Sequence, residues 1–518
     1  MTDSIPVEDL PNQSVRLIIG AVATVLLLAS LGQTIVGTAL PTIVGELGGL
    51  EHLTWVVTAY LLASTVVAPI YGKLGDLYGR KIVLQAAILI FLVGAVLSAM
   101  ASSMTFLIVA RVIQGLGGGG LLVVAMTVVA DVIPPRQRGR IQGIFGAVFG
   151  VATVVGPLLG GFFVEHLGWQ WIFLINLPLG VLALAVIAVA FKQKPGRAQH
   201  KIDYLGAALL TATLSATVLF TSLGGTTFGW LSPVILGLIG VAVASLIGFL
   251  LVEARAAEPI LPLSLFSIPT FSLASGVLFI SGLAMFGALT FLPLFLQTVM
   301  GVSPADSGLQ MLPVMVGMFG TSILSGQLMS RTGRYRWMPI TGSAFITAGL
   351  VLLSTMTQHT EWWLLAVYML VFGIGLGFVN AVLVTVVQNA VPTRVVGVAT
   401  AGTALFRQIG GSLGVSVFGA IFANRLATEL GGAGHGSAFD PAALAALPET
   451  ARDQVLSAFT NALHPVFLIA AAAGVVAVAL AWLIPFRPLA TSLRQEPEAE
   501  IEAEEQMAAA AVGAPSAP

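Results

Sequence analysis

Two arginines stand inside stretches of the chain that are otherwise apolar. Arg111 lies about six residues into one such stretch, and Arg407 lies within another. A charge surrounded by hydrocarbon is costly, so each arginine is a candidate for binding chemistry and each needs a partner. We expect Arg111 to bond to nearby polar side chains or to an anionic group of a bound molecule. The alternative is a structural arginine satisfied by carbonyls and amides. The candidate side-chain partners of Arg111 are Gln33, Thr34 and Gln114.

Other polar side chains in the apolar stretches are candidates for lining the same cavity. Tyr60 lies deep enough in its stretch to reach a cavity. For Asn380 the alternative is a hydrogen bond between helices. Arg407 is as suited to bridging two helices as to contacting a bound molecule.

A short polar segment between two apolar stretches carries the strongest local signal. It reads Gly72-Lys73-Leu74-Gly75-Asp76-Leu77-Tyr78-Gly79-Arg80-Lys81. Its glycines allow a tight turn and close helix approach, and an anion near a helix start is favoured by the helix dipole. Together with Asp131, Asp76 and Arg80 could form an ion-pair latch that breaks when two halves of the molecule move. The alternative is a basic loop that only sets topology.

A later stretch carries glycines spaced by four, which share one helix face. Gly156 and Gly160 belong to this row, and Pro157 stands between them. Small residues let a neighbouring helix approach closely, and proline removes a backbone donor and bends a helix. These three residues are therefore candidates for closing one side of a cavity, with static packing as the alternative.

The elements that position these residues are about fourteen apolar stretches. Nearly all of the 22 Lys and Arg residues fall in alternate gaps or in the tails; the exceptions are Arg111, Arg407, Arg425 and Arg452. This bias indicates a polytopic membrane protein with both termini in the cytoplasm. We expect spans near 17–42, 54–72, 82–101, 105–130, 142–164, 171–191, 204–224, 230–252, 270–299, 306–329, 337–357, 362–389, 397–424 and 463–485.

Composition narrows the class of protein further. Hydrophobic residues make up 57% of the 518 and charged residues 9%, which excludes a water-soluble fold. The net charge of −1 offers no basic face for nucleic acid, and the absence of cysteine excludes a disulfide framework and a thiolate site. The histidines have no metal-ligand spacing, and no phosphate-binding loop is followed by Lys-Ser or Lys-Thr. We expect no enzyme and no cofactor.

A repeated motif indicates that the chain consists of two related halves. The segment Gly326-Gln327-Leu328-Met329-Ser330-Arg331-Thr332-Gly333-Arg334 resembles the one at 72–81. Such internal symmetry is typical of transporter folds built from repeats. We therefore expect an all-α integral membrane protein of two six-helix bundles with an inserted helix pair. The expected parts are a cytoplasmic tail (1–16), an N-terminal bundle (17–191), a linker with the inserted pair (192–269), a C-terminal bundle (270–485) with an external loop (425–462), and a disordered acidic cytoplasmic tail (486–518).

These motifs resemble those of the major facilitator superfamily. The segment 72–81 is similar to its loop signature, with Leu77 where the family has its first arginine. The run Arg111-Val112-Ile113-Gln114-Gly115-Leu116-Gly117 resembles a second motif, and Gly156-Pro157-Leu158-Leu159-Gly160-Gly161 resembles the motif of drug:proton antiporters. With fourteen spans, the resemblance is to the fourteen-span drug:proton antiporter branch. It implies a monomer in the bacterial inner membrane that exports hydrophobic or amphipathic compounds, such as drugs, by alternating access in exchange for protons.

One position departs from the family pattern. In Leu31-Gly32-Gln33-Thr34-Ile35-Val36-Gly37-Thr38-Ala39-Leu40-Pro41, Gly32 stands where the family usually has an aspartate. Proton coupling could instead pass through Asp131 and Asp76. The alternatives are a proton-uncoupled or narrow-specificity exporter of a lipid or an endogenous metabolite, and a membrane sensor or scaffold that does not transport.

Overall fold

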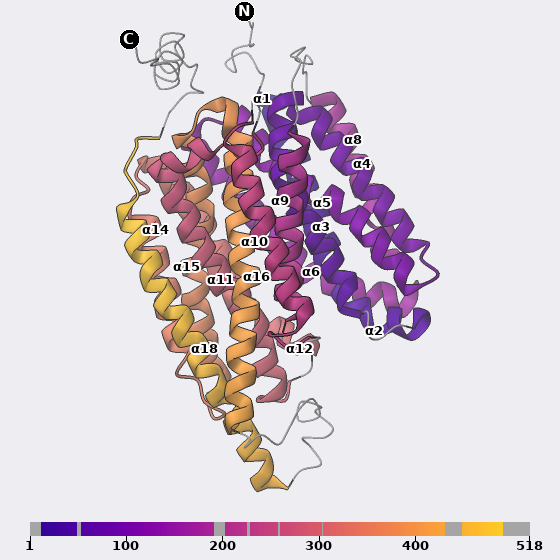
Figure 1. Cartoon of the computed structure of the whole chain (residues 1–518), viewed down its shortest axis with the longest axis vertical. Helices are drawn as coiled ribbons and strands as arrows, with labels where there is room; N and C mark the ends of the chain where they lie inside the picture. Colours follow the sequence, from indigo (N-terminus) through magenta and orange to yellow (C-terminus); the bar gives the residue numbers. More distant parts are fainter. Residues whose placement is uncertain are drawn as a thin grey trace, which may run out of the picture.

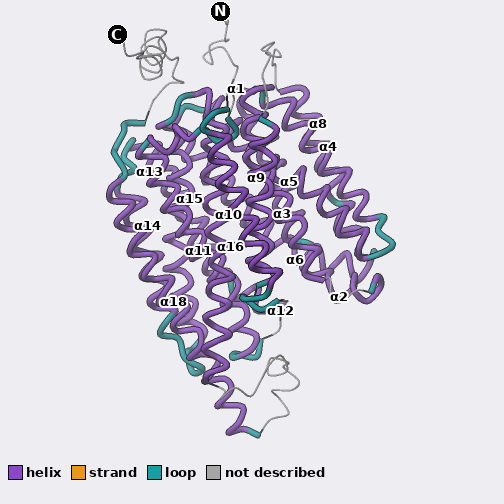
Figure 2. Tube along the Cα trace, viewed as in Figure 1, coloured by secondary structure: helices purple, strands orange, loops and turns teal. Residues whose placement is uncertain are grey.

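The protein is helical throughout the part of the chain that its structure, a computed structural model, describes. That part comprises residues 12–48, 53–190, 203–224, 228–256, 259–302, 304–429 and 448–489. Figure 2 shows helices along almost the whole of this trace, joined by short loops, and within it the only β pairing is an isolated bridge between Gly224 and Phe228. The expected all-α class is confirmed.

The helices follow one another in three groups. The first group is α1 (Asn12–Thr34), α2 (Val36–Leu47), α3 (Leu53–Tyr78), α4 (Arg80–Ala99), α5 (Met104–Val132), α6 (Pro135–His166), α7 (Trp171–Leu174) and α8 (Asn176–Ala190). The second is the pair α9 (Tyr204–Leu223) and α10 (Pro233–Glu253). The third is η3 (Leu263–Ser267), α11 (Pro269–Thr298), α12 (Pro304–Gln310), α13 (Leu312–Thr332), α14 (Trp337–Leu353), α15 (Trp362–Ala390), η4 (Thr393–Val395), α16 (Val396–Glu429) and α18 (Glu449–Leu483).

Many of these helices can cross a membrane. Within the described residues, eleven are long and apolar enough to do so, and Leu17–Gly32 and Trp337–Leu353 are shorter apolar helices. Every backbone polar group in hydrocarbon must be satisfied internally, which a helix achieves. The protein is therefore a multi-pass membrane protein, as predicted.

Several expected spans are interrupted, because hydropathy does not reveal local breaks. The stretch 17–42 divides at Ile35 between α1 and α2, and 306–329 divides at Met311, just before Pro313, which has no N–H to donate. The stretch 171–191 divides at Ile175. There the Asn176 side chain donates to the carbonyl oxygens of Ile172 and Phe173.

Helices also extend into the range 425–462 that we expected to be an external loop. α16 continues to Glu429, and α18 begins at Glu449. These extensions are polar, so a search for apolar runs stops short of them. Residues 430–447 lie outside the described part of the chain, as do 1–11 and 490–518, which include most of the two predicted tails.

The two groups of large helices pack against each other, and the pair α9–α10 lies beside their junction. α13 packs along α6, and α16 packs along α3, while α9 contacts both α3 and α16. Figure 1 shows the pair across the middle of the molecule, between the indigo and purple helices of the first group and the orange and yellow helices of the third. One large apolar core fills the third group and reaches α9 and α10, and two further apolar clusters lie in the first group.

Candidate functional site

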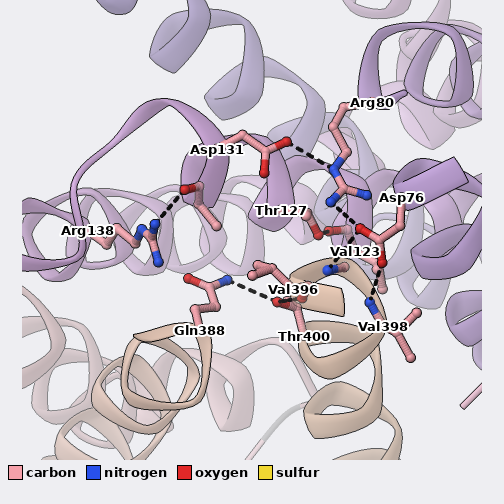
Figure 3. Close-up of polar contacts among 12 residues, drawn as sticks. Asp76, Arg80, Val123, Thr127, Asp131, Arg138, Gln388, Val396, Val398 and Thr400 are labelled. Atoms are coloured by element: carbon pink, nitrogen blue, oxygen red, sulfur yellow. Dashed lines mark hydrogen bonds and ion pairs between the residues drawn. The ribbon is translucent and has the colours of Figure 1, made fainter. Parts of the chain in front are cut away.

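The turn between α3 and α4 brings an arginine and two carboxylates together. Arg80 donates to Asp76 Oδ1 and, through Nε, to Asp131 Oδ2 at 3.0 Å. Gly79 between the two helices has φ of 89°, a conformation that a side chain would strain, so glycine suits this turn. Figure 3 shows Arg80 between the two carboxylates. We call Asp76, Arg80 and Asp131 the latch cluster.

Asp76 also bonds to the other half of the molecule. Its oxygens accept from the backbone N–H groups of Gly397 at 3.2 Å and Val398 at 3.0 Å, at the start of α16. The first N–H groups of a helix lack partners within the helix and favour an anion. Asp76 therefore caps a helix that lies more than 300 residues away in sequence.

Close approach of the two halves depends on a second glycine in the same turn. A Cβ on Gly72 would lie 2.8 Å from the Cβ of Ala401 and 2.9 Å from the carbonyl oxygen of Gly397. A larger residue at position 72 would therefore push α3 and α16 apart. The structure brings Gly72, Gly79 and the latch cluster together, but the sequence offered no signal that α16 is their partner.

Arg111 is fully buried inside the first group of helices. Its Nε donates to the carbonyl oxygen of Val56 at 3.1 Å, and its Nη1 donates to Gly32 O at 3.3 Å and to Gln114 Oε1 at 2.6 Å. Its guanidinium lies 4.3 Å from the centre of the Tyr60 ring, a cation–π arrangement. Among the described side chains, no carboxylate bonds to it. This geometry matches the structural alternative, an arginine held by carbonyls and an amide.

The environment of Gly32 shows that an acid at this position would require Phe91 to move. A Cβ at this position would lie 2.7 Å from Cζ of Phe91, a separation that real Cβ atoms essentially never show. The phenylalanine ring therefore occupies the space beside Arg111 that an aspartate side chain would need. The side chains of Gln33 and Thr34 lie outside the described part of the structure.

The remaining predicted residues lie at other contacts between helices. Arg407 on α16 donates to Asn380 Oδ1 on α15 at 3.4 Å, so these two candidates lie side by side. Gly156 and Gly160 are buried in α6, the helix that packs along α13. The side chain of Pro157 lies outside the described part of the structure.

A cavity of about 570 Å³ lies between α3, α9, α11 and α16. None of its lining residues is charged, and most of the lining area is apolar. Its polar groups are Thr58, Thr65, Thr221, Gln408, Ser412 and Ser416. None of these was a candidate from the sequence, because hydroxyl groups in helices commonly bond to a carbonyl one turn earlier, as Thr65 does to Leu61 at 2.7 Å.

Hydroxyl groups join the inserted helix α9 to α16 at this cavity. Oγ1 of Thr221 and Oγ of Ser412 lie 2.7 Å apart, and the Ser416 hydroxyl donates to the carbonyl oxygen of Thr221 at 2.6 Å. α9 therefore forms a wall of the cavity and is attached to the second half of the molecule. The predicted cavity residues Tyr60, Arg111 and Asn380 do not line this cavity.

Comparisons with known proteins place the chain in a family. The model of the Major Facilitator Superfamily matches residues 22–415. An uncharacterized MFS-type transporter of Mycobacterium tuberculosis is 43% identical over 469 residues, which cover 89% of this chain and 68% of the relative. The multidrug transporter protein MdtP of Bacillus subtilis is 40% identical over 411 residues, covering 79% of this chain and 76% of the relative.

A solved structure shows the same fold. The human organic anion transporter MFSD10 (TETRAN) superposes with a TM-score of 0.62 at 14% identity, covering 91% of this chain and 100% of that chain. As the motifs predicted, the chain belongs to the Major Facilitator Superfamily and is a membrane transporter rather than an enzyme.

Proposed function

We propose that the protein exports hydrophobic or amphipathic small molecules, including drugs, from the cytoplasm across a bacterial inner membrane in exchange for protons. It works as a monomer of fourteen spans, with two six-helix bundles around an inserted pair and both termini in the cytoplasm. The observation that carries this proposal is the pair of hydrogen bonds from the start of α16 to Asp76, which join the two halves at the latch cluster.

The cavity lies toward the other end of the same two helices. Thr58 and Thr65 belong to the first half of α3, whereas Asp76 is near its end; Ser412 and Ser416 lie well beyond the start of α16. A latch at the predicted cytoplasmic end and a cavity nearer the opposite end are what alternating access requires of a state facing outward.

The chemistry of the cavity supports the substrate class. Its volume is within the usual range for small-molecule sites, roughly 300–1,000 Å³. Because its lining carries hydroxyl and amide groups and no charge, it suits an uncharged amphipathic molecule better than a permanent cation. The printed names of relatives, such as multidrug transporter MdtP, support export of drugs.

A second candidate function is export of a lipid or an endogenous metabolite without proton coupling. Gly32, which stands where the family usually has an acid and is closed off by Phe91, favours it. Dependence of export on a proton gradient separates the two candidates.

The test is efflux of an uncharged lipophilic dye, Nile red, from proteoliposomes with an imposed pH gradient that an ionophore can collapse. Gradient-driven efflux supports proton exchange, and efflux that ignores the gradient supports the second candidate. Failure to move this dye or a panel of other uncharged amphipathic dyes contradicts the drug-export proposal and favours the narrower substrate of the second candidate.

A pair of variants locates the substrate in the cavity. A side chain at Gly419, which lines the cavity and has open space around it, fills the cavity without a clash, so Gly419→Leu should slow efflux at least several-fold. Gly240→Leu is the matched control, because position 240 is exposed on α10 and also has open space. Equal efflux by the two variants contradicts the assignment of the cavity.

A further inference from the structure

Two carboxyl groups meet at one end of the inserted pair α9–α10. Asp203 precedes α9, and its Oδ1 accepts from the N–H of Gly206 at 2.8 Å as a helix cap. Glu253 is the last residue of α10, is only 4% exposed, and accepts from the N–H of Leu261 through Oε1. No motif in the sequence singled out Glu253.

The second oxygen of each carboxyl group is buried and has no hydrogen-bond partner. These atoms are Asp203 Oδ2 and Glu253 Oε2. Both border the small space that a Cβ on Gly206 would occupy, so they face a common point. The charged groups around Glu253 are Asp203 on the α9 side and Lys73 from the end of α3, which interacts with it electrostatically; the backbone of Ile260 and Leu261 supplies N–H donors.

The chemistry of the two carboxyl groups indicates what the point between their bare oxygens can hold. Two ionised carboxylates whose buried oxygens border one point repel, and neither of these oxygens has a donor to replace water. One proton removes both penalties, because the protonated group donates an O–H to the other carboxylate. We infer that Asp203 and Glu253 hold one proton between them and form a proton-binding site on the inserted pair.

The site is connected to the latch cluster through α16. Leu261, whose N–H bonds to Glu253, is buried, and its Cδ1 would lie 3.4 Å from a Cβ on Gly402 in the first turns of α16. Asp76 binds the N–H groups of Gly397 and Val398 one turn earlier on the same helix. Loss of the proton makes Asp203 and Glu253 repel each other. The repulsion displaces the segment around Leu261 and weakens the packing of α16 against α3.

The connection to α16 gives the proposed proton exchange a proton-binding site other than position 32. This part of the inference rests on the proposed function. The proton is released when the halves separate at the latch cluster. It is held when they close, because the paired carboxyl groups and the segment around Leu261 then stabilise the start of α16.

Infrared spectroscopy of the purified full chain tests the site without requiring transport. We expect a C=O stretching band of a protonated carboxyl group at neutral pH that is lost in Glu253→Gln and in Asp203→Asn. Asparagine keeps the helix cap, so the second variant guards against misfolding of the first. Glu46→Gln is the control, because Glu46 accepts from the Trp169 indole N–H elsewhere in the molecule, and it should retain the band. A wild-type spectrum equal to that of Glu253→Gln overturns the inference.

Amide hydrogen exchange, corrected for the intrinsic effect of pH, tests the connection. Raising the pH should reduce protection of residues 259–262 and 397–402 in the wild type but not in Glu253→Gln, which cannot ionise. An identical loss in both proteins overturns the link to α16. If the band and the protection behave as expected while no dye is exported, the proposed function fails and the proton site stands.

Discussion

Two buried arginines of the first group of helices show two different ways of satisfying a guanidinium. Arg80 pairs with two carboxylates, one of which also binds the start of α16 in the other half. Arg111 has no carboxylate among its described partners and bonds instead to carbonyl oxygens of α1 and α3 and to Gln114.

This difference separates a contact that can change from one that holds a bundle together. The bonds that Asp76 accepts from the start of α16 cross the junction between the halves, so relative motion of the halves must break them. All bonds of Arg111 lie within one group of helices, where motion of the halves leaves them intact. We therefore propose that the latch cluster takes part in coupling and that Arg111 stabilises the first group of helices.

The largest effect on transport is expected for Asp76→Asn. The Asp76 and Arg80 side chains are 5% and 9% exposed, and breaking a buried ion pair costs about 3–5 kcal/mol. We expect dye efflux from proteoliposomes to fall by about tenfold or more, because the start of α16 loses its anionic cap. Efflux at the wild-type rate would show that the cap on α16 has no part in the transport cycle.

Arg111→Ala should lower the stability of the folded protein rather than act directly on transport. The change leaves Gln114 and two carbonyl groups without a buried donor, and each unsatisfied group costs about 1–3 kcal/mol. We expect a clearly lower melting temperature in detergent and less folded protein in the membrane. The opposite result, an unchanged melting temperature with transport abolished, would favour the substrate-binding role predicted from the sequence.

The contrast between the two arginines also marks what the sequence could reveal. Hydropathy and the distribution of basic residues predicted the helices, since both are properties of contiguous segments. The segment 72–81 carries Asp76 and Arg80 four residues apart, so their pairing was visible. The partner of Asp76 on α16 was not, because it is a pair of backbone N–H groups without a side-chain signature.

Two further features depend on folding in the same way. Glu253 reads as an ordinary charge at a helix end until α9 places Asp203 beside it. The cavity combines hydroxyl groups of helices α3, α9 and α16, none of which is unusual alone. Burial of Arg111 against Tyr60, and the closure of Gly32 by Phe91, likewise arise from packing between segments.

Placing an aspartate at position 32, where the family usually has one, should give Arg111 a carboxylate partner like those of Arg80. Gly32→Asp alone forces Phe91 to move, and overpacking of this kind costs about 1–3 kcal/mol. Combined with Phe91→Ala, the new carboxylate gains room next to Arg111 and to Gln114, whose Nε2 is buried without a partner. We expect the double variant to export a cationic dye several-fold faster than the wild type. The Phe91→Ala single variant is the control for the added space.

The smallest effect is expected for Asp131→Asn, the other carboxylate of the latch cluster. Its side chain is 43% exposed, so water screens its bond with Arg80, and an exposed pair contributes only about 0–1 kcal/mol. We expect efflux to change by no more than about two- to fivefold. Because Asp131 makes no bond to α16 among the contacts described, a loss as large as that of Asp76→Asn would mean that the charge on Arg80, rather than the cap on α16, carries the coupling.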